Sequence, residues 1–288
     1  MRDTILFGDC RETLKEFDEK ARMCVTSPPY YGLRNYGGEE SQIGLEQTPE
    51  EFIKQLVNVF KEVKNVLTDD GTCWVNIGDS YYNYRPGRGQ GLAKQTVSNT
   101  KQDLPDVCPR RGNRIRGLKE KDLIGIPWMF AFAMRADGWY LRQDIIWSKP
   151  NPMPESVRDR CTKSHEYMFL FSKNQNYYFD VDAIKEPTRR KRSEWNVTKK
   201  PYKGAHFAVY PPELIEPCIK AGSEKGDIVL DPFMGSGTTA MVAKSLGRDY
   251  IGCELHEDYG NLIRKRVSEY HPVEEVSQEP SINILDIV

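Results

Sequence analysis

One short segment near the end of the chain constrains the fold more than any other. Apolar residues 228–230 run into Asp231, and a turn containing Gly235 and Gly237 then leads into a predicted helix. Glycines permit positive φ and let a backbone approach a ligand closely. A strand that passes through such a turn into a helix is a unit of α/β proteins with parallel strands. The segment therefore predicts an α/β fold with a ligand site at this turn.

The rest of the chain repeats this alternation. Short apolar runs predict seven strands, at residues 4–7, 22–26, 72–77, 140–147, 166–171, 227–230 and 250–253. Helical spacing predicts five helices, at residues 48–67, 121–136, 211–221, 238–246 and 257–268, with Thr48 as the N-cap of the first and Gly71 just beyond its end. The loops of such a sheet meet at one edge, where ligands bind.

The turn after Asp231 favours a nucleoside cofactor. It lacks the third glycine that a dinucleotide-binding turn uses for tight helix packing. The next strand ends in Gly252, Cys253 and Glu254, and an acidic side chain at that edge can accept hydrogen bonds from ribose hydroxyls. Taken alone, this turn leaves an NAD-dependent oxidoreductase open.

A second motif, Thr26–Ser27–Pro28–Pro29–Tyr30, directly follows a predicted strand and so belongs to the same sheet edge. Consecutive prolines lack N–H groups and present their carbonyls in a rigid line. Acceptors aimed at an exocyclic amine favour the positive charge that grows on nitrogen during alkylation. Tyr30 offers a face on which a base can stack. A proline-rich turn with a core tyrosine is the alternative, and the companion motif argues against it.

The net charge of −1 conceals two basic stretches. Residues 83–121 hold ten Lys or Arg against three Asp or Glu, and residues 148–203 hold thirteen against seven. Phosphate binding requires positive charge on one face rather than a basic protein overall. Solvated loops without a binding role are the alternative. Trp195, beside the run 189–192, suits either an unstacked base or a small core.

Length and composition set the class. The 288 residues fit one large domain with insertions or two smaller ones. The sequence contains no apolar run of about 18 residues, and residues 1–10 lack the pattern of a secretory signal. Seven scattered cysteines without a Cys-x-x-Cys pair predict a reduced, cytoplasmic setting and no structural zinc.

Both motifs together resemble the S-adenosylmethionine-dependent DNA amino-methyltransferases of the β class, in which the base-binding motif precedes the cofactor motif. Most of the chain takes part in this resemblance. Further matching blocks lie at residues 8–10, 74–81, 146–160, 165–166, 206–208 and 211–212. Serine before the prolines is typical of members that methylate N4 of cytosine, although some serine-bearing relatives act on N6 of adenine.

The resemblance assigns roles to individual residues. The catalytic set is Ser27, Pro28, Pro29 and Tyr30. The cofactor-binding set is Asp9, Cys10, Thr26, His206, Phe207, Ala208, Asp231, Pro232, Phe233, Met234, Gly235, Ser236, Gly237, Thr238, Thr239 and Glu254. The DNA-binding set, taken from the basic stretches, is Arg88, Arg110, Arg111, Arg114, Arg116, Arg158, Arg189, Arg190, Lys191 and Arg192. The resemblance implies no metal ion.

The resemblance also implies a Rossmann-like seven-stranded methyltransferase sheet. This sheet is circularly permuted, so that strand 4–7 completes the cofactor-binding half that begins at the strand before Asp231. Residues 1–82 form the catalytic half, residues 122–180 continue the domain, and residues 206–288 form the cofactor-binding half with a C-terminal tail. The basic insertions are residues 83–121, for DNA contact, and 181–205, for target recognition.

The expected reaction is direct methyl transfer to a base flipped out of double-stranded DNA, without a covalent enzyme intermediate. Cys10 and Cys24 are therefore not expected to act as nucleophiles, and His165 and His206 are expected to be structural or, for His206, close to the cofactor. Asp79 either orients groups near the base or is a turn residue. A partner restriction endonuclease and a homodimer stay open. The rival functions are an N6-adenine enzyme, an RNA or protein-amide methyltransferase, an NAD-dependent oxidoreductase and a DNA-binding module without catalysis.

Overall fold

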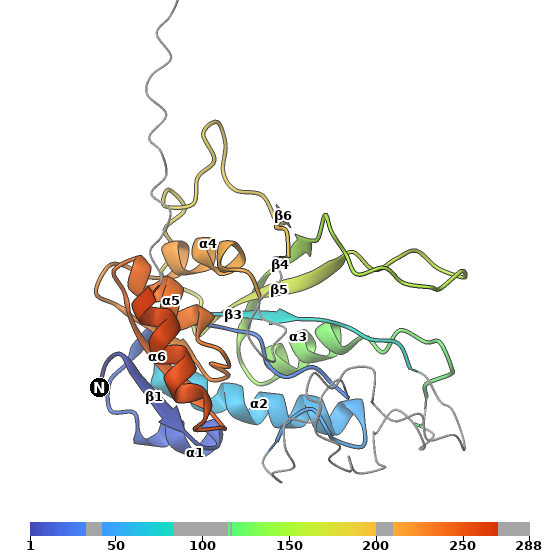
Figure 1. The fold of residues 1–288 in the computed structure, drawn as a ribbon, viewed down its shortest axis with the longest axis horizontal. Helices are drawn as coiled ribbons and strands as arrows, with labels where there is room; N and C mark the ends of the chain where they lie inside the picture. The colour runs from blue at the N-terminus through green and yellow to red at the C-terminus, as the bar shows by residue number, and fades with distance from the viewer. Residues whose placement is uncertain (33–41, 83–114, 116, 200–209, 270–288) are drawn as a thin grey trace, which may run out of the picture.

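The computed structural model describes residues 1–32, 42–82, 115, 117–199 and 210–269, which form an eight-stranded sheet flanked by helices (Figure 1). The strand order is β1-β8-β7-β2-β3-β5-β4-β6. The strands are β1 (Thr4–Phe7), β2 (Ala21–Thr26), β3 (Leu67–Ile77), β4 (Tyr140–Ser148), β5 (His165–Ser172), β6 (Glu194–Asn196), β7 (Ile228–Asp231) and β8 (Asp249–Glu254). The predicted α/β class is confirmed, and all seven expected strands are present.

Two features of the sheet differ from the expectation. The eighth strand, β6, has three residues, which is too short for an alternating pattern to reveal it. The sheet is also mixed rather than parallel, because β5 runs antiparallel to both β3 and β4. The first strand of the chain, β1, pairs with β8, and β8 pairs with β7, so β1 extends the half of the sheet that carries Asp231. The circular permutation itself stays a prediction.

The helices follow the sequence signals closely. They are α1 (Cys10–Thr13), α2 (Pro49–Val66), α3 (Ile126–Ala136), α4 (Pro212–Gly222), α5 (Thr238–Ser245) and α6 (Tyr259–Glu269), with a 3₁₀ turn at Leu14–Glu16. Thr48 caps α2 as expected, in a reciprocal capping box with Glu51. Gly71 does not end this helix; it lies inside β3, which starts directly at Leu67. Within the described residues, no helix is both long and apolar enough to cross a membrane.

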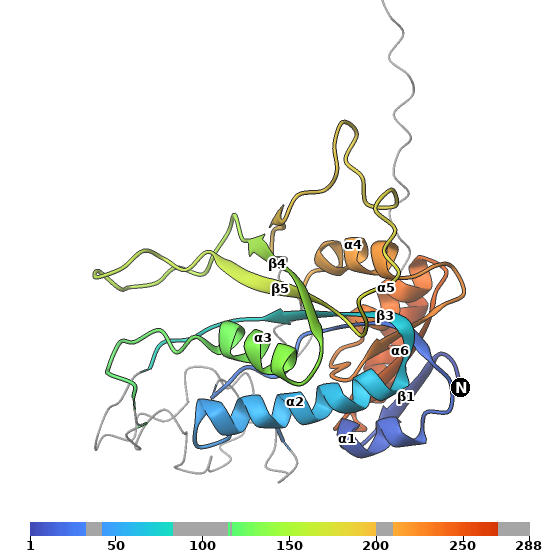
Figure 2. The same cartoon turned by 180° about the vertical axis from the view of Figure 1, so that it is seen from behind.

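The sheet buries side chains on both faces. Along β5, Phe169 and Phe171 join one apolar cluster with residues of α2 and α3, whereas Met168 and Leu170 join a second cluster with residues of α4 and α5. This alternation follows from the period of two along a strand. Figures 1 and 2 show the resulting three layers, with α2 and α3 on one side and α4, α5 and α6 on the other. The carboxyl ends of β1, β2, β3, β7 and β8 therefore meet at one edge.

Candidate active site

The two sequence motifs meet at this edge. β2 and β7 are parallel neighbours, so the residues that follow them emerge side by side. The Thr26 hydroxyl donates a hydrogen bond of 2.5 Å to Oδ1 of Asp231. Both side chains are buried. The predicted base-binding turn and the predicted cofactor turn are thus joined directly through the interior.

Asp231 is the centre of a buried hydrogen-bond network. Its carboxylate also accepts hydrogen bonds from the Thr239 hydroxyl, from the Tyr210 hydroxyl at 3.2 Å and from the Phe233 N–H at 3.0 Å. Burial raises the pKa of Asp231, and the hydrogen bonds from Thr239 and Thr26 oppose this rise. Its described partners are all donors from the protein, so Asp231 shapes the cofactor turn from the inside. The sequence did not single out Tyr210, because its hydrogen bond to Asp231 is evident only in the folded structure.

The turn after Asp231 has the glycine geometry that the sequence predicts. Gly235 and Gly237 have φ values of 53° and 82°. A Cβ at Gly237 would lie 2.6 Å from Cγ2 of Ile263, so α6 packs directly on this turn. The Ser236 and Thr238 hydroxyls face Arg266 of α6, whose guanidinium donates to both. These two hydroxyls are therefore hydrogen-bonded within the protein, and the assignment of Ser236 and Thr238 to the cofactor stays a prediction.

Glu254, at the end of β8, lies beside this turn. Its carboxylate accepts hydrogen bonds from the Gly235 N–H at 2.8 Å and from the His256 N–H at 3.1 Å. Burial raises the pKa of Glu254 to about 7, and the backbone hydrogen bonds only partly offset this effect. A carboxylate held here by two backbone N–H groups keeps lone pairs available for further donors.

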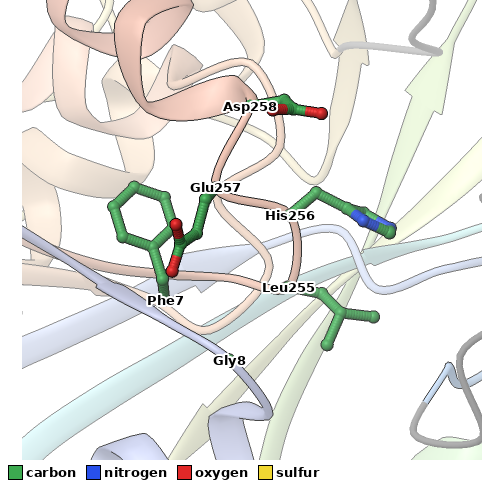
Figure 3. A pocket seen from close by; sticks show the side chains of 6 residues that line it. All are labelled: Phe7, Gly8, Leu255, His256, Glu257 and Asp258. Atoms are coloured by element: carbon green, nitrogen blue, oxygen red, sulfur yellow. The ribbon is translucent and has the colours of Figure 1, made fainter.

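A pocket of about 460 Å³ opens at the ends of β1 and β8 (Figure 3). It is lined by Phe7, Gly8, Leu255, His256, Glu257 and Asp258. Its size lies within the range of small-ligand sites, roughly 300–1,000 Å³. Nε2 of His256 is buried, and no described residue provides it with a hydrogen-bond partner. The pocket lining thus combines the Phe7 ring and the Leu255 side chain with one imidazole and two carboxylates, and this mix of apolar and polar groups suits a nucleoside. The sequence reasoning missed His256.

Asp9 and Cys10 lie next to this pocket, at the start of α1. Asp9 caps the helix by accepting from the Arg11 N–H and forms an ion pair with the Arg11 guanidinium. Burial tends to raise the pKa of Asp9, but the hydrogen bonds from Arg11 outweigh it and lower the pKa. Burial also raises the pKa of Cys10 and Cys24. Both cysteines are therefore buried thiols, unsuited to nucleophilic attack.

On the other side of the Thr26–Asp231 bond, Ser27, Pro28, Pro29 and Tyr30 leave β2. The Tyr30 ring lies on the end of β3, where a Cβ at Gly78 would come within 2.7 Å of Cε2 of Tyr30. The Tyr30 hydroxyl donates to Oε2 of Glu166 at 2.7 Å, and Asn76 lies next to both. These contacts fix the orientation of the ring.

Glu166 in turn forms an ion pair with Lys149, which lies 4.3 Å from the centre of the Trp147 ring. The two charged side chains are only 9% and 16% exposed. Burial lowers the pKa of Lys149, while the charge of Glu166 opposes that change. Lys149 follows β4 and Glu166 lies near the start of β5, which are paired ends of adjacent antiparallel strands. The sequence placed both in a family block without giving them a role.

Contacts in the structure bear on three further expectations. The Asp79 carboxylate accepts hydrogen bonds from the Gly125 and Ile126 N–H groups at the start of α3, so its contacts are those of a turn residue. His165 stacks edge-on against Tyr167, which is a structural contact. Trp195 is 5% exposed and its indole donates to the Arg192 carbonyl, so it anchors a core and is not available to stack on a base.

The described part of the DNA-binding set lies on the surface. Arg158, Arg189, Arg190 and Arg192 are exposed, and Lys191 lies 5.1 Å from the centre of the Trp195 ring. Arg189 pairs with Glu186. Several predicted residues lie outside the described residues, namely Arg88, Arg110, Arg111, Arg114, Arg116, His206, Phe207 and Ala208.

Comparison with known families decides the classification. A family model described as DNA methylase, of the N6 and N4 methyltransferases, matches residues 21–265. The chain belongs to the DNA methylase family. The match covers both motifs and nearly the whole described sheet. The two turns therefore belong to the part of the chain that is matched by the DNA methylase family.

Curated relatives of this DNA methylase are Type II methyltransferases. M.XycI of Xanthomonas campestris pv. cyanopsidis is 49% identical over 280 residues, which cover 93% of this chain and 88% of the relative. M.Cfr9I of Citrobacter freundii is 48% identical over 276 residues, covering 92% of this chain and 87% of that one. M.SmaI of Serratia marcescens is 48% identical over 276 residues, covering 91% of this chain and 90% of that one.

Solved structures share the fold. The PvuII DNA methyltransferase, described as cytosine-N4-specific, matches with a TM-score of 0.67 at 20% identity over 96% of this chain and 89% of that one. The M1.HpyAVI complex with S-adenosylmethionine matches with a TM-score of 0.58 at 20% identity, covering 91% of this chain and 98% of that one. The expected Rossmann-like methyltransferase fold is therefore confirmed, with eight strands instead of seven.

Proposed function

We propose that this DNA methylase transfers the methyl group of S-adenosylmethionine to N4 of a cytosine flipped out of double-stranded DNA. The observation that carries the proposal is the hydrogen bond between Thr26 and Asp231. It joins the turn that suits a nucleoside cofactor to the turn that suits a planar amine, at one sheet edge. A methyl donor bound at the first turn and a base bound at the second would therefore be neighbours.

The cofactor side fits the nucleoside portion of S-adenosylmethionine. Phe7 and Leu255 provide apolar groups in the pocket lining, and the His256 imidazole lies beside them. Glu254 would accept hydrogen bonds from the ribose hydroxyls. The turn from Asp231 to Thr239 would bring its backbone close to the rest of the cofactor. Asp9 and Cys10 would lie beside the adenine.

On the base side, Ser27 and the Pro28 carbonyl would accept hydrogen bonds from the exocyclic amine, and Tyr30 would stack on the base. The bound cofactor supplies an electrophilic methyl group. The amine nitrogen would form the new N–C bond as the methyl group leaves sulfur, which would keep the electron pair, and the nitrogen would release a proton to solvent. Orienting the two reactants contributes at most about 7–11 kcal/mol for ideal alignment.

Ser27 favours N4 of cytosine over N6 of adenine, and the PvuII enzyme, named as cytosine-N4-specific, is among the matching folds. The Type II names of the relatives support a place beside a cognate restriction endonuclease in a bacterial cytoplasm. The exposed arginines near residue 190 support contact with DNA phosphates.

The test is to incubate the protein with plasmid DNA and S-adenosylmethionine and then map modified bases by single-molecule sequencing. N4-methylcytosine at one short sequence is the expected result. Modification of adenine alone would overturn the base assignment while leaving the reaction class intact. Labelled methyl transfer to RNA or protein in preference to DNA would overturn the substrate, and cofactor binding by NAD alone would overturn the reaction.

A further inference from the structure

A long arm, residues 149–164, joins β4 to β5 and leaves the sheet beside the base-binding turn. Figure 1 shows it extending well beyond the sheet, away from the layers that form the core. Lys149 and Glu166 at its base form the buried ion pair, and Glu166 accepts the hydrogen bond from Tyr30. The arm therefore starts next to Tyr30, the residue proposed to stack on the target base, and extends away from it.

The arm is braced along its length. Arg160 pairs with Glu155 at 2.7 Å, and its guanidinium lies 3.8 Å from the centre of the Tyr81 ring. Lys121 pairs with Asp159 at 2.7 Å, which ties the arm to the chain preceding α3. Near the base of the arm, the Asn151 side chain exchanges two hydrogen bonds with the Lys199 backbone. Prolines at positions 150, 152 and 154 restrict the backbone further.

This bracing leaves an apolar side chain in solvent. Met153 is 74% exposed, more than any other exposed large apolar side chain in the described residues, and Val157 is 39% exposed. Arg158 is exposed and has no ion pair within the part of the chain that the structure describes. Residues 149–164 contain four Lys or Arg and two Asp or Glu. An exposed apolar side chain on a basic, braced arm suits a polyanion that offers an apolar space, as a base stack with one base removed does.

We propose that this arm enters the duplex beside the target base, and that Met153 fills the space which the flipped base leaves in the stack. This inference rests on the proposed function. Apolar side chains, methionine among them, are known to insert between base pairs, where they lower the net cost of unstacking. Arg158 would contact a phosphate next to the insertion. The position of the arm, directly beside Tyr30, favours DNA over a protein as its partner.

The test compares Met153→Ala with the wild-type protein in single-turnover methylation of two duplexes that carry the mapped site. One duplex is fully paired, and in the other the target base is mismatched, so that less energy is needed to flip it. We expect Met153→Ala to be about tenfold or more slower on the paired duplex and close to wild type on the mismatched one, since about 1.4 kcal/mol corresponds to tenfold. Met153→Leu should restore most of the rate.

Phe132→Ala is the matched control, because Phe132 is 48% exposed on α3 and lies outside the arm. It should leave both rates unchanged. If Met153→Ala matches wild type on the paired duplex, or is equally slow on both duplexes, the role of Met153 is overturned while the proposed function stands. If the wild-type protein methylates neither duplex, the proposed function fails, and the role of the arm fails with it.

Discussion

Thr26 and Asp231, which are 205 positions apart in the chain, share a buried hydrogen bond of 2.5 Å at the adjoining ends of β2 and β7. The bond ties the rigid Pro28–Pro29 turn to the glycine turn that ends at α5. Because both partners are buried, neither turn can shift without breaking a hydrogen bond in the interior. The distance between the two proposed binding sites is therefore set by the core of the sheet.

Replacement of Asp231 by Asn should weaken both stability and cofactor binding. The Thr26 and Thr239 hydroxyls and the Phe233 N–H all donate to this carboxylate, and an amide would turn an N–H₂ group toward one of them. The mismatch should cost about 1–3 kcal/mol of unfolding free energy. Urea unfolding and calorimetric titration with S-adenosylmethionine measure the two effects. Tyr210→Phe, which removes one donor only, is the milder control; an Asp231→Asn protein as stable as wild type would contradict the network.

Glu254 should make stability depend on pH near neutrality. Its pKa in the folded protein is about 7, above the ordinary value of 4.5, because it is buried. The folded state thus favours the protonated form, so the stability that Glu254 contributes is present below pH 4.5 and is lost as the pH rises through 7. Relative to Glu254→Gln, wild type should lose at most about 3 kcal/mol of unfolding free energy between pH 4 and pH 8.

The same carboxyl should act in the opposite direction on cofactor affinity. Only the ionised form offers all its lone pairs to ribose hydroxyls, so the affinity of wild type for S-adenosylmethionine should rise as the pH passes 7. Glu254→Gln should bind more weakly and show little change over this range. Titration calorimetry from pH 6 to pH 8 measures both proteins. Parallel pH profiles for the two would show that Glu254 does not contact the cofactor.

The sequence predicted the fold well because its signals are local. Apolar runs locate every described strand except the three-residue β6, and Thr48 with Glu51 marks the start of α2. The expectation that β5 is parallel to its neighbours was wrong. Residues 149–164 connect β4 to β5, and a connection of this length carries no short turn signal for a hairpin. β6 was missed because three residues do not establish a period.

The candidate site was predicted less completely, for a physical reason. A motif identifies which residues surround a ligand, but it does not give the direction of each side chain. Asp231, Ser236 and Thr238, whose assignment to the cofactor stays a prediction, also make contacts inside the protein that the motif does not reveal. The pair between Lys149 and Glu166 requires two strand ends to be adjacent, and that adjacency exists only once the sheet is formed.

Disrupting the Lys149–Glu166 pair should be costly unless both charges are removed. Either Lys149→Met or Glu166→Gln leaves a buried charge without its partner, at a cost of about 3–5 kcal/mol in unfolding free energy. The double variant should be more stable than either single variant. The exposed pair Lys121–Asp159 is the control, and its removal should cost no more than about 1 kcal/mol. Additive losses in urea unfolding would show that Lys149 and Glu166 act independently.

The arginines beside β6 should affect DNA binding through phosphates. Arg190 and Arg192 are exposed, and Arg189 is paired with Glu186, so the first two are the better candidates for phosphate contact. Replacing each with Ala should weaken binding to all duplexes and reduce the slope of log affinity against log salt by about one per arginine. Fluorescence anisotropy at several salt concentrations measures the slope. Lys61→Ala on α2, on the opposite face, should leave it unchanged. A loss confined to the target sequence would instead indicate that these arginines read bases, because phosphate contacts carry no sequence information directly.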